Sequence, residues 1–278
     1  MVLREFKFRA PDGTPLFARG WEPGKARAAV LLCHGMGEHG GRYDRFAREL
    51  ADAGIATYAP DLRGHGRSGG RRGHVLRFRE LVDDLERTRQ EALGRLPPGV
   101  PTFLLGHSLG GLVALRYLQE LPGAGFRGAI FSAPLLGIAV RSPVWKRVAA
   151  RILSGILPWV PFASANEPAD LSSDPAANEA FRADPLIHSW VTPRMYTEVG
   201  KALRTVRRRP LPSGLPLLFL IPDTDRVVRA DHALAFARSL LGGARVEELR
   251  GTRHEPLNDR DRDRVVGIIR EWIVAFSG

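Results

Sequence analysis

A serine flanked by two glycines stands in the sequence Gly106-His107-Ser108-Leu109-Gly110. An apolar run at 100–105 precedes this motif and predicts a buried strand, and residues 112–121 after it have the apolar spacing of a helix. A sharp turn between a strand and a helix is the context in which Gly-x-Ser-x-Gly presents its serine as a nucleophile. We therefore predict that Ser108 is a catalytic nucleophile, with a helix amino terminus beneath it.

A serine hydroxyl attacks only when a base takes its proton and a third group orients that base. In an architecture with this turn, the acid and then the histidine follow the serine along the chain. Apolar runs at 215–221 and 245–249 predict the strands after which these two groups should come. The loop after the second run contains one histidine, His254, which we predict to be the base. His232, at the start of a predicted helix, is the alternative base.

The loop after 215–221 contains two candidate acids, Asp223 and Asp225. We favour Asp225, because Asp223 is well placed to accept hydrogen bonds from its own backbone in a local turn. Asp61 also follows a predicted strand, but it precedes the serine in the chain. We interpret Asp61 and the nearby Arg63 and His65 as structural.

The negative oxygen of a tetrahedral intermediate needs N–H donors aimed at it. By position, the candidates are the backbone N–H groups of Leu109, directly after the serine, and of Met36, in the loop after the apolar run at 28–33. That run ends at Cys33, next to His34, so a cysteine–histidine pair is an alternative nucleophile and base. We interpret Cys33 instead as a small apolar residue at a buried strand end.

Strands and helices alternate along most of the chain, which predicts an α/β fold with a mostly parallel sheet covered by helices on both faces. Eight strands are predicted at 6–8, 16–21, 28–33, 55–59, 100–105, 126–131, 215–221 and 245–249. The predicted helices lie at 43–53, 75–93, 112–121, 231–241 and 262–276.

The alternation stops between 135 and 206, where apolar residues have helical spacing and prolines are frequent. We expect a core in two parts, 1–134 and 207–278, and a helical cap insertion at 135–206 that covers the carboxyl edge of the sheet. The cap has more apolar residues than docking requires, so we expect some of them to bind substrate or to touch a membrane. The candidates for substrate binding are Trp145, Ile152, Ile156 and Trp159. The alternative is that these residues pack the cap onto the core.

Composition limits the other classes of protein. No apolar run reaches the roughly 18 residues that span a bilayer, and a single cysteine excludes an intramolecular disulfide. The net charge is +11, but the arginines are scattered, so we expect no nucleic-acid partner, although transient contact with anionic lipid surfaces is expected. The start of the chain reads as a strand rather than a signal peptide, so we expect a cytoplasmic protein that associates peripherally with membranes. The sequence does not determine the oligomeric state.

Several segments together resemble the monoacylglycerol lipases and related lysophospholipases. The segment His34-Gly35-Met36-Gly37-Glu38-His39-Gly40-Gly41-Arg42-Tyr43 resembles their oxyanion loop, and Gly106-His107-Ser108-Leu109-Gly110-Gly111 their nucleophile turn. Asp61-Leu62-Arg63-Gly64-His65-Gly66-Arg67-Ser68, Asp225-Arg226-Val227-Val228 and His254-Glu255 are similar to their other motifs. Pro222 stands where the family usually has glycine, which leaves both Asp223 and Asp225 open.

The resemblance implies an α/β-hydrolase fold, a triad of Ser108, Asp225 and His254, and Met36 and Leu109 as oxyanion donors. The leading hypothesis is a serine carboxylester hydrolase that cleaves small acyl or lipid esters and needs no metal or organic cofactor. A proline-releasing peptidase is the first alternative. It would use cap carboxylates to hold a free amino terminus, for which Glu167, Asp170, Asp174 and Glu179 are available. A non-catalytic ligand-binding protein of the same fold is the second.

Overall fold

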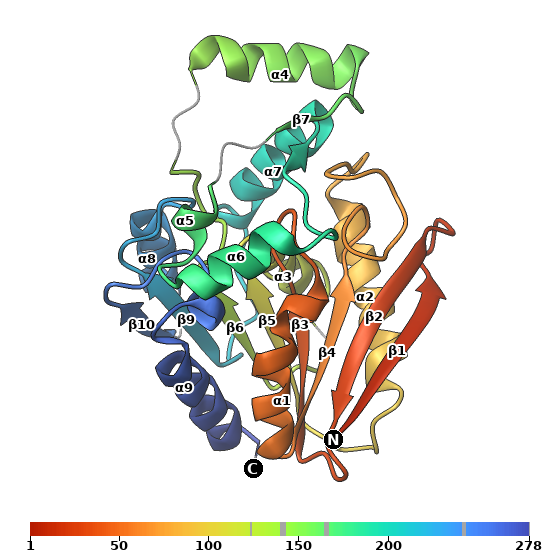
Figure 1. The fold of residues 1–278 in the computed structure, drawn as a ribbon, viewed down its shortest axis with the longest axis vertical. Helices are drawn as coiled ribbons and strands as arrows, with labels where there is room; N and C mark the ends of the chain where they lie inside the picture. The colour runs from red at the N-terminus through yellow and green to blue at the C-terminus, as the bar shows by residue number, and fades with distance from the viewer. Residues whose placement is uncertain (123, 140–142, 164–166, 241–242, 278) are drawn as a thin grey trace.

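An eight-stranded sheet forms the centre of the computed structural model, which describes residues 1–122, 124–139, 143–163, 167–240 and 243–277 (Figure 1). The strand order is β1-β2-β4-β3-β5-β6-β9-β10. β2 pairs antiparallel with both β1 and β4, and the other neighbours are parallel. The predicted fold class is therefore confirmed. The strands are β1 (Val2–Arg9), β2 (Pro15–Glu22), β3 (Ala28–Cys33), β4 (Ile55–Asp61), β5 (Thr102–His107), β6 (Gly128–Ser132), β9 (Leu217–Pro222) and β10 (Arg245–Leu249).

Helices cover both faces of this sheet, which is why its central strands are apolar along their whole length. One buried cluster joins the sheet to α2, α3, α7 and α8, and a second joins the opposite face to α1 and α9. Figure 1 shows α1 and α9 in front of the sheet. These helices are α1 (Asp44–Asp52), α2 (Arg79–Leu93), α3 (Leu109–Glu120), α7 (Pro193–Val206), α8 (Ala230–Arg238) and α9 (Arg262–Ala275), and a short 3-10 turn, η1 (Gly40–Tyr43), leads into α1.

Three helices differ by three or more residues from their predicted ranges. α3 begins at Leu109 instead of 112, directly after the serine. α2 begins at Arg79, four residues later than predicted, because the chain before it is held against α7: the N–H of Phe78 donates to the Glu198 carboxylate at 3.0 Å. The apolar stripe of α2 still faces the core as expected. α8 ends at Arg238, and residue 241 of the predicted helix lies outside the described residues.

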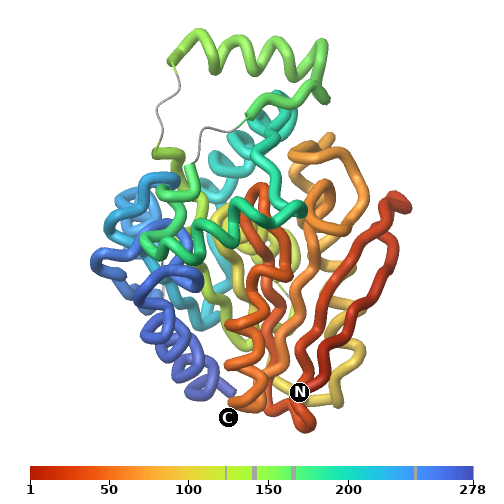
Figure 2. The backbone as a smooth tube through the Cα atoms, in the orientation of Figure 1, coloured from red at the N-terminus to blue at the C-terminus, as the bar shows by residue number. Residues whose placement is uncertain are grey.

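The chain between β6 and β9 folds mainly into helices, and the predicted cap residues 140–142 and 164–166 lie outside the described residues. α4 lies at the far end of the molecule, well separated from the sheet, whereas α5 and α6 lie close to the sheet's carboxyl edge (Figure 2). A short antiparallel ribbon, β7–β8, accompanies them. No helix within the described ranges is both long and apolar enough to cross a bilayer. The elements are α4 (Val144–Ile156), β7 (Phe162–Ala163), α5 (Pro168–Leu171), α6 (Pro175–Ala183) and β8 (Trp190–Val191).

Candidate active site

Ser108 lies in the turn between β5 and α3, with φ of 50° and ψ of −117°. Few residues with a side chain adopt this left-handed region, so the turn holds the serine in a strained backbone conformation. Close packing requires the glycines on both sides. A Cβ on Gly110 would lie 2.0 Å from the carbonyl oxygen of Cys33, and a Cβ on Gly106 would lie 2.5 Å from the carbonyl oxygen of Gly110. The motif therefore fits its turn for steric reasons.

His254 and Asp225 meet at this serine. The Nε2 atom of His254 lies 2.9 Å from the Oγ atom of Ser108, and its Nδ1 atom lies 2.8 Å from Oδ2 of Asp225. The other oxygen of Asp225 accepts the backbone N–H groups of Val227 and Val228, which fixes the carboxylate in place. The structure thus brings the three predicted residues together, although they are far apart in the sequence.

Asp223 serves a different purpose. Its carboxylate accepts the backbone N–H of Gly251 at 2.7 Å and so ties the loop after β9 to the loop after β10. The contact therefore joins two loops, whereas the sequence predicted a contact within the local turn of Asp223. Of the two candidate acids, only Asp225 is hydrogen bonded to His254.

The charge of Asp225 changes the basicity of His254. Burial alone would lower the pKa of the imidazole, but the nearby carboxylate outweighs this effect and raises that pKa above its ordinary value. The neighbouring His107 ring, 5.0 Å away between centroids, lacks such a partner, and burial lowers its pKa. The site therefore keeps His107 neutral while it makes His254 the stronger base.

The loop after β3 is tied down by a buried ion network. Glu38 accepts the backbone N–H of Gly35 at 2.6 Å and the hydroxyl of Tyr43 at 2.9 Å. Arg42 bridges Glu38 to Glu255, with two bonds of 2.7 Å to the latter. Because Glu255 follows His254, this network joins the loop of the predicted oxyanion donor to the loop of the predicted base.

The residues of this network were not singled out in the sequence. The signal that could have found them is the spacing of Glu38 and Arg42, an acid and a base four residues apart in a loop beside the candidate site. Met36 lies on the same loop and lines the cavity described below, and Leu109 is the first residue of α3. A Cβ on Gly35 would lie 3.2 Å from the Cβ of Ser108, so this loop passes directly over the serine.

A cavity of about 1020 Å³ opens at the serine. Ser108 and His254 lie in its wall, and the segments between β6 and β9 form much of its opposite side. These residues come from α4, β7, α5, α6, β8 and α7 and from the loops between them. The apolar part of the lining includes Met36, Leu135, Phe162, Val191, Met195 and Val228.

The four residues expected to bind substrate in the cap do not line this cavity. Trp145, Ile152, Ile156 and Trp159 are 67%, 57%, 66% and 47% exposed. The reason is the orientation of α4, which turns its polar face to the protein. The hydroxyl of Ser154 lies 2.9 Å from that of Thr197 on α7, so the apolar face of α4 points outward.

Known proteins resemble this chain over nearly its whole length. Residues 24–261 match the Hydrolase_4 family, described as serine aminopeptidase, S33. A monoacylglycerol lipase from Mycolicibacterium smegmatis is 32% identical, covering 98% of this chain and 97% of the relative. The human monoglyceride lipase is 36% identical over 78% of this chain and 71% of its own length. The solved monoacylglycerol lipase from Paleococcus ferrophilus is 28% identical, with a TM-score of 0.83 over 99% of this chain and 100% of that one.

The chain belongs to the Hydrolase_4 family. Its likeness to the lipases confirms that it is an α/β-hydrolase and a serine ester hydrolase, as the resemblance of its motifs implied.

The peptidase alternative is not favoured for this Hydrolase_4 member, although the family description names an aminopeptidase. Glu167 and Asp170 form a capping box at the start of α5, and Asp174 caps α6. None of these residues, nor Glu179, lines the cavity. The acidic groups that do line it already have partners: those of Glu38 and Glu255 pair with Arg42, and Asp184 binds His39.

The alternative candidates for nucleophile, base and acid have structural contacts away from Ser108. Both ring nitrogens of His34 bind backbone groups, with Nε2 accepting the N–H of Leu62, and burial raises the pKa of the Cys33 thiol. His232 contacts Arg207 rather than the serine. Asp61 accepts the backbone N–H of Gly40 at 2.9 Å. Among the described residues, no cluster of three or more His, Cys, Asp or Glu side chains is arranged to hold a metal ion.

Proposed function

We propose that this protein hydrolyses monoacylglycerol-like esters through an acyl-enzyme formed on Ser108. The observation that carries the proposal is the continuous hydrogen-bonded path from Asp225 through His254 to Ser108, which ends at a large cavity. A nucleophile, a base and an orienting acid in this arrangement are what acyl transfer requires.

In the first half of the reaction, the Oγ atom of Ser108 attacks the ester carbonyl while Nε2 of His254 takes the hydroxyl proton. Asp225 stabilises the imidazolium that forms and so raises the pKa of His254. A more basic imidazole takes the serine proton more readily, which favours this step. The backbone N–H groups of Met36 and Leu109 donate to the oxyanion. Each such donor lowers the barrier by about 3–4 kcal/mol.

The tetrahedral intermediate then collapses. The bond from the carbonyl carbon to the glycerol oxygen breaks, and His254 returns its proton to that oxygen, which releases the alcohol. A water molecule next attacks the acyl carbonyl and gives its proton to His254. The bond to Ser108 Oγ breaks, the serine regains its proton, and the fatty acid leaves.

The cavity supports a substrate with a long apolar part and a small polar head. Its volume of about 1020 Å³ is at the upper end of the range for small-molecule sites, and its apolar lining suits an acyl chain. Residues 135–206 act as a cap in this proposal, because the elements between β6 and β9 supply much of the cavity wall opposite Ser108. The names of the relatives, which are lipases of monoglycerides, point to the same class of substrate.

Transient contact of α4 with lipid surfaces is part of the proposal. Its outward face carries Trp145, Val148, Ile152 and Ile156, all exposed. An exposed apolar face of this kind on an amphipathic helix is typical of a segment that lies in a membrane interface. Such contact would bring the cavity close to lipid-dissolved substrates.

A panel of glyceryl monoesters with short to long acyl chains tests the substrate class, with a lysophospholipid and an aminoacyl anilide beside them. We expect release of fatty acid from the monoglycerides and no amine release from the anilide. Ser108→Ala provides the blank. Turnover of the anilide without ester hydrolysis would contradict the proposal, as would ester hydrolysis at an equal rate in the blank.

A further inference from the structure

A second hollow, of about 640 Å³, lies between α4, α7 and the start of α8, on the side of α7 next to α4. We call it the basic groove. Its lining includes several cationic side chains, and within the described part of the chain no aspartate or glutamate lines it. The cationic residues are Arg147, Arg151, Arg194, Lys201, Arg204 and Arg207.

The arginines at the open side of the groove are not neutralised within the protein. Arg151 and Arg204 are exposed, and among the described residues neither side chain forms an ion pair or a hydrogen bond. α4 contains no acidic residue over its whole length, so nothing on the helix itself offsets Arg147 and Arg151. Because guanidinium groups stay charged at every physiological pH, the groove carries a permanent positive potential.

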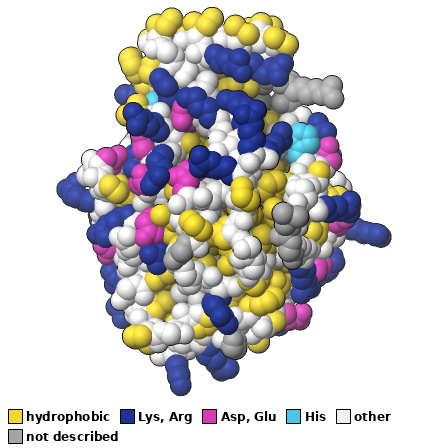
Figure 3. All heavy atoms as spheres, turned by 180° about the vertical axis from the view of Figure 1, so that it is seen from behind, with side chains coloured by type: hydrophobic (Ala, Val, Ile, Leu, Met, Phe, Trp, Pro, Cys, Tyr) yellow, Lys and Arg dark blue, Asp and Glu magenta, His cyan; other side chains and the backbone are white. Residues whose placement is uncertain are grey.

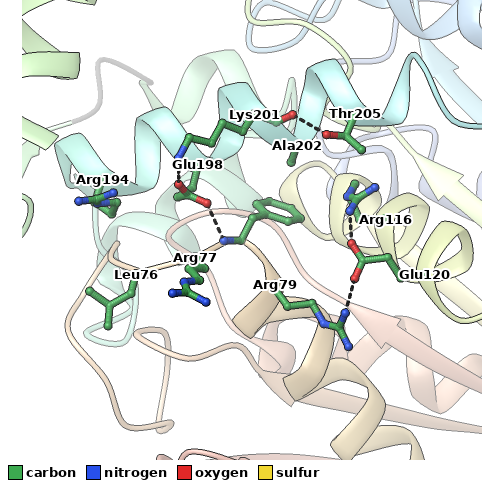
Figure 4. A pocket seen from close by; sticks show the side chains of 11 residues that line it. Leu76, Arg77, Arg79, Arg116, Glu120, Arg194, Glu198, Lys201, Ala202 and Thr205 are labelled. Carbon is green, nitrogen blue, oxygen red and sulfur yellow. Dashed lines mark hydrogen bonds and ion pairs between the residues drawn. The ribbon is translucent and has the colours of Figure 1, made fainter. Parts of the chain in front are cut away.

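A neighbouring hollow, of about 380 Å³, shows that unpaired charge is not general on this surface. It is lined partly by the other side of α7, and three of its cations, Arg79, Arg116 and Lys201, pair with carboxylates (Figure 4). Glu120 binds both Arg79 and Arg116, and Glu198 binds Lys201 at 2.6 Å. The basic groove differs from it because no carboxylate among the described residues lines the groove, which is the arrangement expected of an anion-binding surface.

The position of the groove indicates which anion. On α4, Arg147 and Arg151 are one turn apart, on the side that includes Ser154 and faces α7, and the apolar residues lie on the other side. Viewed from behind, hydrophobic side chains run along the outer edge of the molecule at the α4 end, with a band of Lys and Arg directly beneath them (Figure 3). An apolar edge above a cationic band matches a bilayer, in which phosphates lie just outside the hydrocarbon.

We propose that the basic groove binds the phosphate-bearing head groups of anionic phospholipids and so directs the protein to negatively charged membranes. This inference rests on the proposed contact of α4 with lipid surfaces, to which it adds selectivity for charge. The arginines favour this ligand because their planar donors fit phosphate oxygens in pairs. Each basic residue near an anionic surface strengthens binding by about fivefold.

Sedimentation with vesicles tests the proposal. One vesicle is phosphatidylcholine alone, and the other contains one-third phosphatidylglycerol. We expect the natural protein to bind the second at least about tenfold more tightly, and Arg151→Gln/Arg204→Gln to lose that preference while it still binds phosphatidylcholine. Arg260→Gln/Arg270→Gln is the matched control. It removes two exposed arginines whose side chains also form no ion pair or hydrogen bond with the described residues but lie away from the groove, and it should keep the preference.

Three results would overturn the proposal. They are no preference in the natural protein, an equal loss in the groove and control variants, and binding of inorganic phosphate in the groove without a preference for anionic vesicles. Turnover of a soluble nitrophenyl ester is expected to be unchanged in both variants. This assay distinguishes a failure of the groove proposal from a failure of the proposed function. Loss of vesicle selectivity with normal turnover concerns the groove alone, and absent turnover with normal selectivity concerns the ester chemistry alone.

Discussion

The insertion between β6 and β9 contains two regions that meet the rest of the molecule in opposite ways. The region from α5 to β8 is fastened to the catalytic loops. The backbone N–H of His188 donates to the carbonyl of Gly37 at 2.9 Å, and the N–H of Glu255 donates to that of Leu171 at 2.8 Å. α4, by contrast, contacts α7 through polar groups and leaves its apolar face in solvent.

This difference indicates that the two regions of the insertion have separate functions. The α5–β8 region shapes the cavity, because its hydrogen bonds fix it to the loops that carry His254 and Met36. α4 supplies Lys146 and Arg147 to the cavity wall, but its apolar face presents a surface to solvent. Apolar side chains exposed in a contiguous group usually mark an interaction site rather than a structural contact.

Removal of the nucleophile should have the largest effect, and it should affect the cavity but not α4. Ser108→Ala should reduce kcat for a soluble ester by about 10⁴-fold or more, because among the described residues no other hydroxyl in the cavity wall is hydrogen bonded to a histidine. Vesicle binding should not change, since it depends on α4. A steady-state assay and a sedimentation assay on the same preparation check both expectations, and a variant that still turned over would place the nucleophile elsewhere.

The next effect concerns the acid. Asp225→Asn should lower kcat by about 10²–10⁴-fold, because the imidazolium loses its counter-charge, whereas Asp223→Asn should cost less than about threefold. In the natural protein, kcat/KM should fall as the pH drops through a His254 pKa above the ordinary value of about 6.5. Asp225→Asn removes the charge that raises this pKa, so the acid limb should move to lower pH. A pH–rate profile of each variant measures this shift, and a larger loss in Asp223→Asn would reverse the assignment.

The smallest effect comes from making the same change, isoleucine to alanine, at one buried position and at one exposed position. Ile130→Ala, in the buried strand β6, should lower the free energy of unfolding by about 2–5 kcal/mol. Ile152→Ala, on the exposed face of α4, should change it by no more than about 0.5 kcal/mol. Urea denaturation compares the two. A large loss of stability in Ile152→Ala would mean that α4 is packed in solution, which would break the comparison.

The sequence predicted the core well because its signals are local. The apolar run of β3 and the motif around Ser108 each specify an element and the residue at its end. The order of the serine, the acid and the histidine then follows from the order of the strands. The choice of Asp225 over Asp223 depended on loop geometry, which a single sequence only suggests.

The orientation of α4 could not be predicted in the same way. Its spacing places Trp145, Ile152 and Ile156 on one side of a helix, but spacing does not say whether that side faces the protein or the solvent. The network of Glu38, Arg42 and Glu255 was missed for a related reason. Arg42 and Glu255 lie more than 200 residues apart in the chain, and only the fold brings their two loops together.

Cys33 is the only cysteine of the chain, and it is buried at the end of β3. Burial raises the pKa of its thiol, so alkylating reagents should leave it unmodified. A cysteine introduced on the outer side of α4, as in Trp145→Cys, would therefore be the single reactive sulfhydryl of the molecule. A polarity-sensitive fluorophore attached there would change its emission when the helix passes from water into hydrocarbon, without any other cysteine having to be removed first.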